Sequence, residues 1–311
     1  MESSASRKPA RPGRDHLDAR AMALLVFLCA IWGLQQVAIK FAIAGVAPVL
    51  QGSIRSAGAV VLLWLWCHWR GIALFERDRS LWPGIAAALM FAGEFALIYW
   101  GLNFTRASRG VVFLYTAPFI VAIGAQIFLP QERLGRAQWA GLACAFAGVV
   151  LLFGESLGLP SGREALGDSL LFGAAVFWAA TTVTIKASVL ARVSAEKTLF
   201  YQLAGSALVL PLVSIFLGES WRVQLTPMVV GSLLFQTVVV AAASYLAWFW
   251  MVKNYAVTKV SAFSFLTPVF GVLAGAALLS EPLTAILLAA LVLVGAGIWL
   301  VNRPRPAAGG G

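Results

Sequence analysis

The sequence predicts an all-α membrane protein in which ten transmembrane helices form an inverted repeat of two five-helix halves. Composition is the first reason: 60% of the 311 residues are hydrophobic, 12% are charged, and the mean hydropathy is +0.86. A soluble domain has about 25% charged residues, so a soluble enzyme, a disordered chain and a nucleic-acid-binding domain are excluded. The apolar runs are continuous, unlike the alternating strands of a membrane β-barrel. In addition, the second half of the chain repeats motifs of the first.

A transmembrane helix needs roughly 20 mostly apolar residues, and clusters of charged residues, proline and glycine divide the chain into ten such segments. We expect the spans at 21–39, 48–67, 82–101, 109–128, 136–153, 169–187, 196–217, 228–252, 260–279 and 283–301. The first span follows a basic stretch, as a signal peptide does. We interpret it as a transmembrane helix because it recurs within the repeat.

Lysine and arginine are concentrated in alternate connecting segments. Of the 23 cations, 17 lie on the side of the N-terminus, 5 lie on the opposite side and one, Arg55, lies inside a span. Because cytoplasmic loops carry the excess of positive charge, we expect both termini in the cytoplasm. The net charge of +10 is then a topology signal. The expected order is cytoplasmic tail, first repeat, external linker, second repeat and cytoplasmic tail, at residues 1–20, 21–153, 154–168, 169–301 and 302–311.

Matched motifs relate the two halves. Trp32 and Lys40 in the first span correspond to Trp178 and Lys186 in the sixth. The same order and an offset of 146–151 residues hold for the remaining pairs, which are 56–63 with 203–210, Asn103 with Asn254, Pro118 with Pro268 and Glu132 with Glu281. Five spans are an odd number, so the second copy crosses the membrane upside down. Inverted repeats are the architecture of many secondary transporters.

Three features occur together in this chain. They are ten spans in two halves, Trp32-Gly33 followed by a lysine, and a proline in spans 4 and 9 followed by Glu-x-Leu turns at 132–134 and 281–283. In this combination the chain resembles the EamA branch of the drug/metabolite transporter superfamily. The resemblance covers residues 20–302. It extends to bacterial amino-acid and metabolite exporters, including the aromatic amino-acid type. It implies a location in the bacterial inner membrane and a central cavity lined mainly by spans 1, 3, 4, 6, 8 and 9.

Two ionisable side chains stand out well inside spans, where they are costly and mark a pathway or a partner. Glu94 in span 3 is a candidate proton-coupling acid or contact for a substrate ammonium group. The alternative is a structural ion pair with Arg55 or Lys40. Arg55 in span 2 is a candidate for binding a substrate carboxylate bidentately. The alternatives for Arg55 are structural pairing or extension toward the outer interface.

Aromatic and polar residues near the middle of the spans are the other candidates for binding substrate. They are Trp32, Gln35, Gln36, Tyr115, Trp178, Thr181, Thr182, Tyr245 and Trp248. The alternative role for these residues is helix packing. Pro118 and Pro268 are expected to bend spans 4 and 9, either as hinges or as static kinks. The turn acids Glu132 and Glu281 are expected to cap helix ends.

Sequence features of other protein classes are weak. Residues 154–158 fit the GxSxG pattern of a serine hydrolase, but that pattern needs a strand-to-helix turn and a histidine partner, and His16 and His68 are poorly placed. The three cysteines, Cys29, Cys67 and Cys144, form no paired motif, so we expect no metal site, disulfide or cofactor. No nucleotide-binding fingerprint occurs.

The expected function is therefore a secondary transporter that exports small organic metabolites, with amino acids preferred, by alternating access. A multidrug or nucleotide-sugar carrier is the alternative within transport, and an intramembrane enzyme is the alternative of another class. The expected partners are a small-molecule substrate, the lipid bilayer and, for coupling, protons. Ten helices can enclose a cavity without a second copy, so a monomer is sufficient.

Overall fold

The computed structural model describes residues 17–154, 157–279 and 285–303, and the regular elements in these ranges are all helical. Ten helical spans in them are long and apolar enough to cross a membrane, which confirms the all-α, ten-span prediction. The elements are α1 (Ala19–Ile43), α2 (Pro48–Arg70), α3 (Leu81–Gly101), α4 (Ala107–Leu114), α5 (Ala117–Phe128), η1 (Pro130–Glu132), α6 (Arg136–Phe153), α7 (Gly162–Ala187), η3 (Val189–Ala191), α8 (Ala195–Phe216), α9 (Pro227–Leu234), η4 (Phe235–Ser244), α10 (Tyr245–Asn254), α11 (Val257–Phe263), α12 (Leu266–Leu279) and α13 (Ala285–Asn302). Glu281 and nearly all residues of the two predicted tails lie outside the described ranges.

Spans 4 and 9 are each built from two helical segments. Residues 115–116 separate α4 from α5, and residues 264–265 separate α11 from α12. The sequence predicted a proline bend within each span. Instead each helix stops and restarts, and Pro118 and Pro268 lie in the first turn of the second segment. Proline is tolerated there because an amide in the first turn has no partner within the helix.

Span 8 changes its winding in the middle. The ten residues of η4, between α9 and α10, form a π-helix. A π-helix is rare and occurs frequently at functional sites. Three of the ten spans therefore depart from regular α-helix, and all three belong to the set expected to line the interior.

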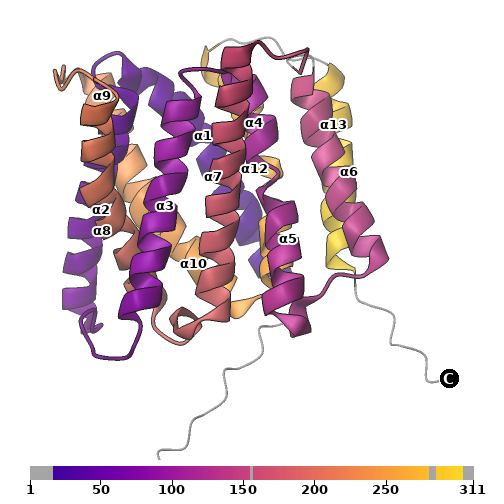
Figure 1. Ribbon diagram of the computed structural model, residues 1–311, viewed down its shortest axis with the longest axis horizontal. Helices are drawn as coiled ribbons and strands as arrows, with labels where there is room; N and C mark the ends of the chain where they lie inside the picture. Colours follow the sequence, from indigo (N-terminus) through magenta and orange to yellow (C-terminus); the bar gives the residue numbers. More distant parts are fainter. Residues whose placement is uncertain (1–16, 155–156, 280–284, 304–311) are drawn as a thin grey trace, which may run out of the picture.

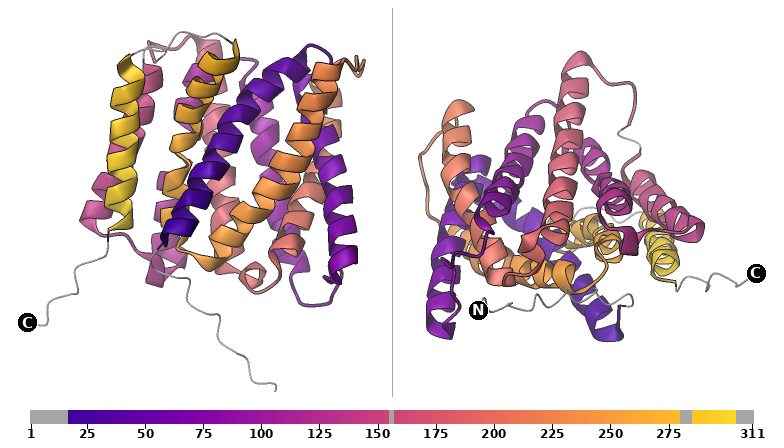
Figure 2. Two further views of the ribbon diagram at one scale, coloured as in Figure 1. Left: turned by 180° about the vertical axis from the view of Figure 1, so that it is seen from behind. Right: turned by 60° about the horizontal axis from the view of Figure 1, so that its bottom comes forward.

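Close helix pairs hold the bundle together (Figures 1 and 2). α6 runs along α13, α2 along α8, α1 along α12 and α5 along α7, while α3 packs against both α7 and α8. The backbones of α6 and α13 touch. A Cβ atom built on Gly297 would lie 2.4 Å from the amide nitrogen of Ala145 and 2.5 Å from the carbonyl oxygen of Gly141. α1 begins and α13 ends at the same end of the bundle (Figure 2, left panel).

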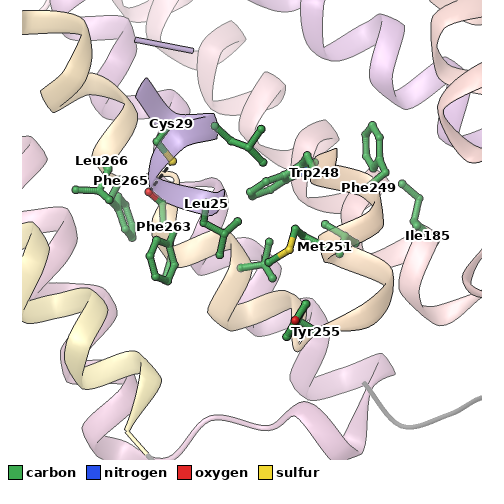
Figure 3. Packing of buried hydrophobic residues seen from close by; sticks show 14 of the residues in the cluster. Leu25, Cys29, Ile185, Trp248, Phe249, Met251, Tyr255, Phe263, Phe265 and Leu266 are labelled. Carbon is green, nitrogen blue, oxygen red and sulfur yellow. Dashed lines mark hydrogen bonds between the residues drawn. The ribbon is translucent and has the colours of Figure 1, made fainter. Parts of the chain in front are cut away.

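The outer surface of the bundle is apolar, as a lipid-facing surface must be. Large apolar side chains are largely exposed along it, among them Trp69, Phe75, Trp82, Leu208 and Phe216. The interior is packed with smaller and aromatic side chains. Figure 3 shows Leu25 and Cys29 of α1 packed beside Phe263 and Trp248, with the Cys29 thiol donating to the carbonyl oxygen of Phe263 at 3.2 Å.

Helix α7 begins seven residues earlier than the predicted span 169–187. Ser161 accepts a hydrogen bond from the Glu164 amide, and the Glu164 carboxylate accepts one from the Ser161 amide, so a capping box starts the helix at Gly162. The first turns of α7 therefore occupy part of the predicted linker 154–168. Charged residues made this stretch resemble a loop, because the sequence gives no sign that Asp168 is buried.

Candidate functional site

Arg55 in α2 is buried, and part of its guanidinium group has no hydrogen-bond partner in the described part of the chain. Its side chain is 1% exposed, so it does not extend toward the interface. The guanidinium carbon lies 4.6 Å from the ring centre of Phe95 and 5.8 Å from that of Tyr245. Its Nε and Nη1 atoms are buried without a hydrogen-bond partner in the described part of the chain. These two N–H groups can therefore donate hydrogen bonds to a ligand.

Glu94 in α3 is the acid that faces this cation. Its side chain is buried, and Arg55 is the charged group that acts on it most directly. Among the described residues the two groups form no ion pair within 4.0 Å. A basic and an acidic side chain thus lie near each other in the interior. This separation argues against the Arg55–Glu94 ion pair, which is one of the two structural pairs that the sequence left open.

Tyr245 connects the charged groups to an aromatic cluster. Its ring centre lies 6.2 Å from that of Trp32 and 5.9 Å from that of Phe91. Trp248 packs edge-on against Trp32 at 5.0 Å, and Gln35 lies near the Tyr245 hydroxyl. Spans 1, 3 and 8 of the set predicted to line the interior, joined by span 2, therefore bring together the following candidates: Arg55, Glu94, Trp32, Gln35, Tyr245 and Trp248.

The remaining candidates form a second cluster at the break in span 4. Tyr115 lies in that break, and its ring centre is 5.9 Å from that of Trp178 in a T-shaped arrangement. Thr267, from the first turn of α12, lies near the Tyr115 hydroxyl, and its own hydroxyl is buried without a hydrogen-bond partner among the described residues. Thr181 is buried, and its hydroxyl has no partner among the described residues. The Tyr115 hydroxyl is close enough to Glu94 to interact with it electrostatically. The two clusters are therefore neighbours.

Two predicted residues do not join these clusters. Gln36 is exposed and its side chain extends toward α12, with its Cγ atom 3.8 Å from the position of a Cβ on Gly271. Thr182 donates to the carbonyl oxygen of Trp178 at 3.0 Å, which satisfies its hydroxyl within α7. Both lie one residue away from a candidate that does face the interior.

Sequence reasoning missed several residues of the site. Phe91 and Phe95 form ring contacts with the predicted residues, but phenylalanine is common in every span. Ser244 accepts a hydrogen bond from the Trp32 indole at 2.9 Å. It closes the π-helix η4, where the wider winding changes the face on which each side chain lies. Only the mid-span position of Tyr245 signalled this region.

Two buried ion pairs hold α7 to the flanks of span 4. Near the start of α7, Arg109 binds Asp168 through Nε at 2.9 Å and Nη2 at 2.6 Å. The sequence counted Arg109 as an external cation, whereas the structure buries it in α4. At the other end of α7, Lys186 pairs with Glu132 at 3.4 Å, and Glu132 accepts a hydrogen bond from the Val257 amide at 2.6 Å. Glu132 thus caps α11.

The loop between α2 and α3 is tied to α8 at the end of the bundle. Asp78 pairs with Lys197 at 2.9 Å and accepts a hydrogen bond from the Ser80 hydroxyl. Partial burial alone would raise the pKa of Asp78, but the hydrogen bonds from Ser80 and Lys197 outweigh it and lower this pKa to about 2. Open cavities of about 330 and 480 Å³ border the loop, away from the central clusters. No group of metal-binding side chains occurs in the described ranges.

Comparison with known proteins gives one family. The sequence profile of the EamA-like transporter family matches residues 19–154 and 165–303. An uncharacterized transporter of Bacillus subtilis is 32% identical over 93% of this chain and 93% of its own length. A probable amino-acid metabolite efflux pump of Salmonella typhimurium is 29% identical over 90% of this chain and 93% of its own length. A solved structure with a TM-score of 0.79 covers 92% of this chain and 97% of its own at 21% identity, which establishes the fold alone.

Proposed function

Because the chain belongs to the EamA-like transporter family, we propose that it is a secondary transporter that exports amino acids across the bacterial inner membrane. The relatives described as probable amino-acid metabolite efflux pumps support this substrate class. The observation that carries the proposal is the pair of guanidinium donors on Arg55 that have no hydrogen-bond partner among the described residues and that lie near the buried carboxyl group of Glu94.

An amino acid is a zwitterion, and this pair of groups matches its two charges. Arg55 binds the α-carboxylate through charge-assisted hydrogen bonds, which are the strong kind. Glu94 binds the α-ammonium group. The amino-acid side chain then lies among Trp32, Tyr245 and Trp248, which favour apolar and aromatic substrates.

Alternating access follows from the proposed inverted repeat. The family profile matches two stretches of similar length, and the helices that the repeat makes equivalent, α2 with α8 and α6 with α13, pack against each other. A two-fold relation lets the halves exchange roles and expose the site first to one side and then to the other. The breaks at 115–116 and 264–265 are the hinges we propose for this exchange.

Glu94 is also the group we propose for proton coupling, because a carboxylate that binds a substrate ammonium group can instead bind a proton. The cation distribution supports cytoplasmic termini, so export begins on the side where α1 begins. A single copy contains all the residues invoked.

Flux into proteoliposomes, measured for a panel of amino acids with and without a pH gradient, tests this function. We expect flux of apolar or aromatic amino acids that responds to the gradient, and loss of that response in Glu94→Gln. Glu164→Gln, at a half-buried acid in the first turn of α7, is the matched control and should behave as wild type, because a glutamine side chain can keep the capping hydrogen bond. Absence of amino-acid flux under both conditions would overturn the proposed substrate class.

A further inference from the structure

Two helices carry the same pair of side chains where they end. α2 ends with Arg70, four residues after Trp66, and Arg303 directly follows α13, four residues after Trp299. Residues four apart are neighbours on one face of a helix. Both helices end at the lower end of the bundle in Figure 1, with α2 and α13 at opposite edges in the two side views.

In each pair the guanidinium group lies over an indole ring. The guanidinium carbon of Arg303 is 3.6 Å from the ring centre of Trp299. That of Arg70 is 5.4 Å from the ring centre of Trp66 and 6.0 Å from that of Trp69. A ring attracts such a cation through its quadrupole, and this contact leaves the N–H groups of the guanidinium available as hydrogen-bond donors.

Both pairs lie on the outer surface of the bundle. The three indoles are between 41% and 74% exposed, and Arg70 and Arg303 are exposed as well. Neither arginine takes part in an ion pair with another residue of the described ranges. The two pairs therefore present a positive charge and an aromatic surface to whatever surrounds the bundle at this level.

The end of α2 does not require Arg70 as a cap. A cation near the C-terminal end of a helix can bind the last carbonyl groups. Here the backbone binds them, because the amides of Gly71 and Ile72 donate to the carbonyl oxygens of His68 and Cys67 at 3.3 and 2.8 Å. The donors of Arg70 therefore remain for a partner outside the chain.

The chemistry of the two pairs matches a phospholipid headgroup. Tryptophan is enriched where the hydrocarbon core meets the headgroups, and an arginine one helical turn closer to water lies at the level of the lipid phosphates. A guanidinium group binds phosphate through charge-assisted hydrogen bonds that are frequently bidentate. The same end of the bundle carries the excess of lysine and arginine, which attracts lipids with a net negative charge.

We propose that Trp66, Trp69 and Arg70 form one binding site for an anionic phospholipid, and that Trp299 and Arg303 form a second. In each site the arginine binds the lipid phosphate, and the indoles contact the glycerol and the upper acyl chain. The sites lie at opposite edges of the bundle, so two lipid molecules bind independently. This inference concerns a lipid partner and does not depend on the transported substrate.

Lipid retention by the purified full chain tests the two sites. Native mass spectrometry with added phosphatidylglycerol should show two molecules that bind more tightly than any further ones, whereas phosphatidylcholine should show no such pair. Arg70→Gln and Arg303→Gln should each raise the Kd of one lipid by about fivefold or more, and the double variant should raise both. Wild-type retention by the double variant, or equal retention of the two lipids by the wild type, would overturn the proposal.

Matched variants separate the two sites from a general effect of charge. Arg222→Gln removes an exposed cation next to Trp221 in the loop before α9, and it should leave both Kd values unchanged. Arg70→Lys and Arg303→Lys keep the charge without the planar group, so they should weaken retention by less than the glutamine variants. A loss of phosphatidylglycerol in Arg222→Gln as large as in Arg70→Gln would reduce the effect to net charge and overturn the two sites.

Discussion

Arg55→Met should make the protein more stable and impair binding at the same time. Methionine is unbranched and of similar length, so it fills the space left by the arginine stem. It also removes two buried N–H groups that have no partner among the described residues. A residue kept for function at a cost in stability behaves in this way.

The magnitude follows from the contacts of the guanidinium. Each unsatisfied buried donor costs about 1–3 kcal/mol, and the contact with the Phe95 ring at 4.6 Å offsets at most about 2 kcal/mol. The two donors together cost about 2–6 kcal/mol, so with the full offset we expect Arg55→Met to raise the free energy of unfolding by up to about 4 kcal/mol. Two charge-assisted hydrogen bonds to a substrate carboxylate, at about 1.5–3 kcal/mol each, are lost, so amino-acid binding should weaken by at least about 100-fold.

Thermal unfolding in detergent and calorimetric titration with an amino acid measure the two effects. Arg109→Met is the matched control, because the Arg109 guanidinium is paired with Asp168 at 2.6 Å. Breaking that buried pair should cost about 3–5 kcal/mol. If Arg55→Met lowers the melting temperature as much as Arg109→Met and leaves binding unchanged, Arg55 is a structural residue and the reasoning fails.

Further predictions concern the stability of the fold. Gly297→Ala should destabilise the α6–α13 crossing by about 1–3 kcal/mol, whereas Gly295→Ala, with no atom within 4 Å of the new methyl group, should be neutral or stabilising; equal melting temperatures would contradict the backbone contact. Glu132→Ala should lower stability by about 1–3 kcal/mol, because the buried α11 amide loses its acceptor, and unchanged unfolding would refute the cap. The pKa of Asp78 is lowered to about 2, so its pairing with Lys197 stabilises the fold above about pH 4. The stability difference between wild type and Asp78→Asn should therefore shrink as pH falls toward 2. A difference that stays constant with pH would contradict the pairing.

The ten spans could be predicted from the sequence because the apolar length of a membrane helix is a strong constraint. Helix ends were predicted less well where charges are buried in pairs. Asp168 resembles a loop residue until Arg109 is known to lie beside it, and that contact joins residues 59 positions apart. Short-range patterns cannot reveal such a partner.

The charged residues of the site could be predicted for a simple physical reason. Arg55 and Glu94 are conspicuous because ionisable side chains are rare within spans. The aromatic residues were identified only in part, since Phe91 has no feature that distinguishes it from a packing residue. The π-helix η4 was not foreseen, because a change from i→i+4 to i→i+5 hydrogen bonds leaves no mark in an apolar sequence.

The Arg55–Glu94 site is tested most directly by measuring the binding of three related compounds. They are one aromatic amino acid, the corresponding amine without the carboxylate, and the corresponding acid without the ammonium group. Calorimetry on the purified protein should give a Kd for the zwitterion at least about tenfold lower than for either half-analogue. Arg55→Met should abolish the preference over the amine alone, and Glu94→Gln the preference over the acid alone. Equal affinity for the amino acid and both half-analogues would contradict recognition of a zwitterion by this pair.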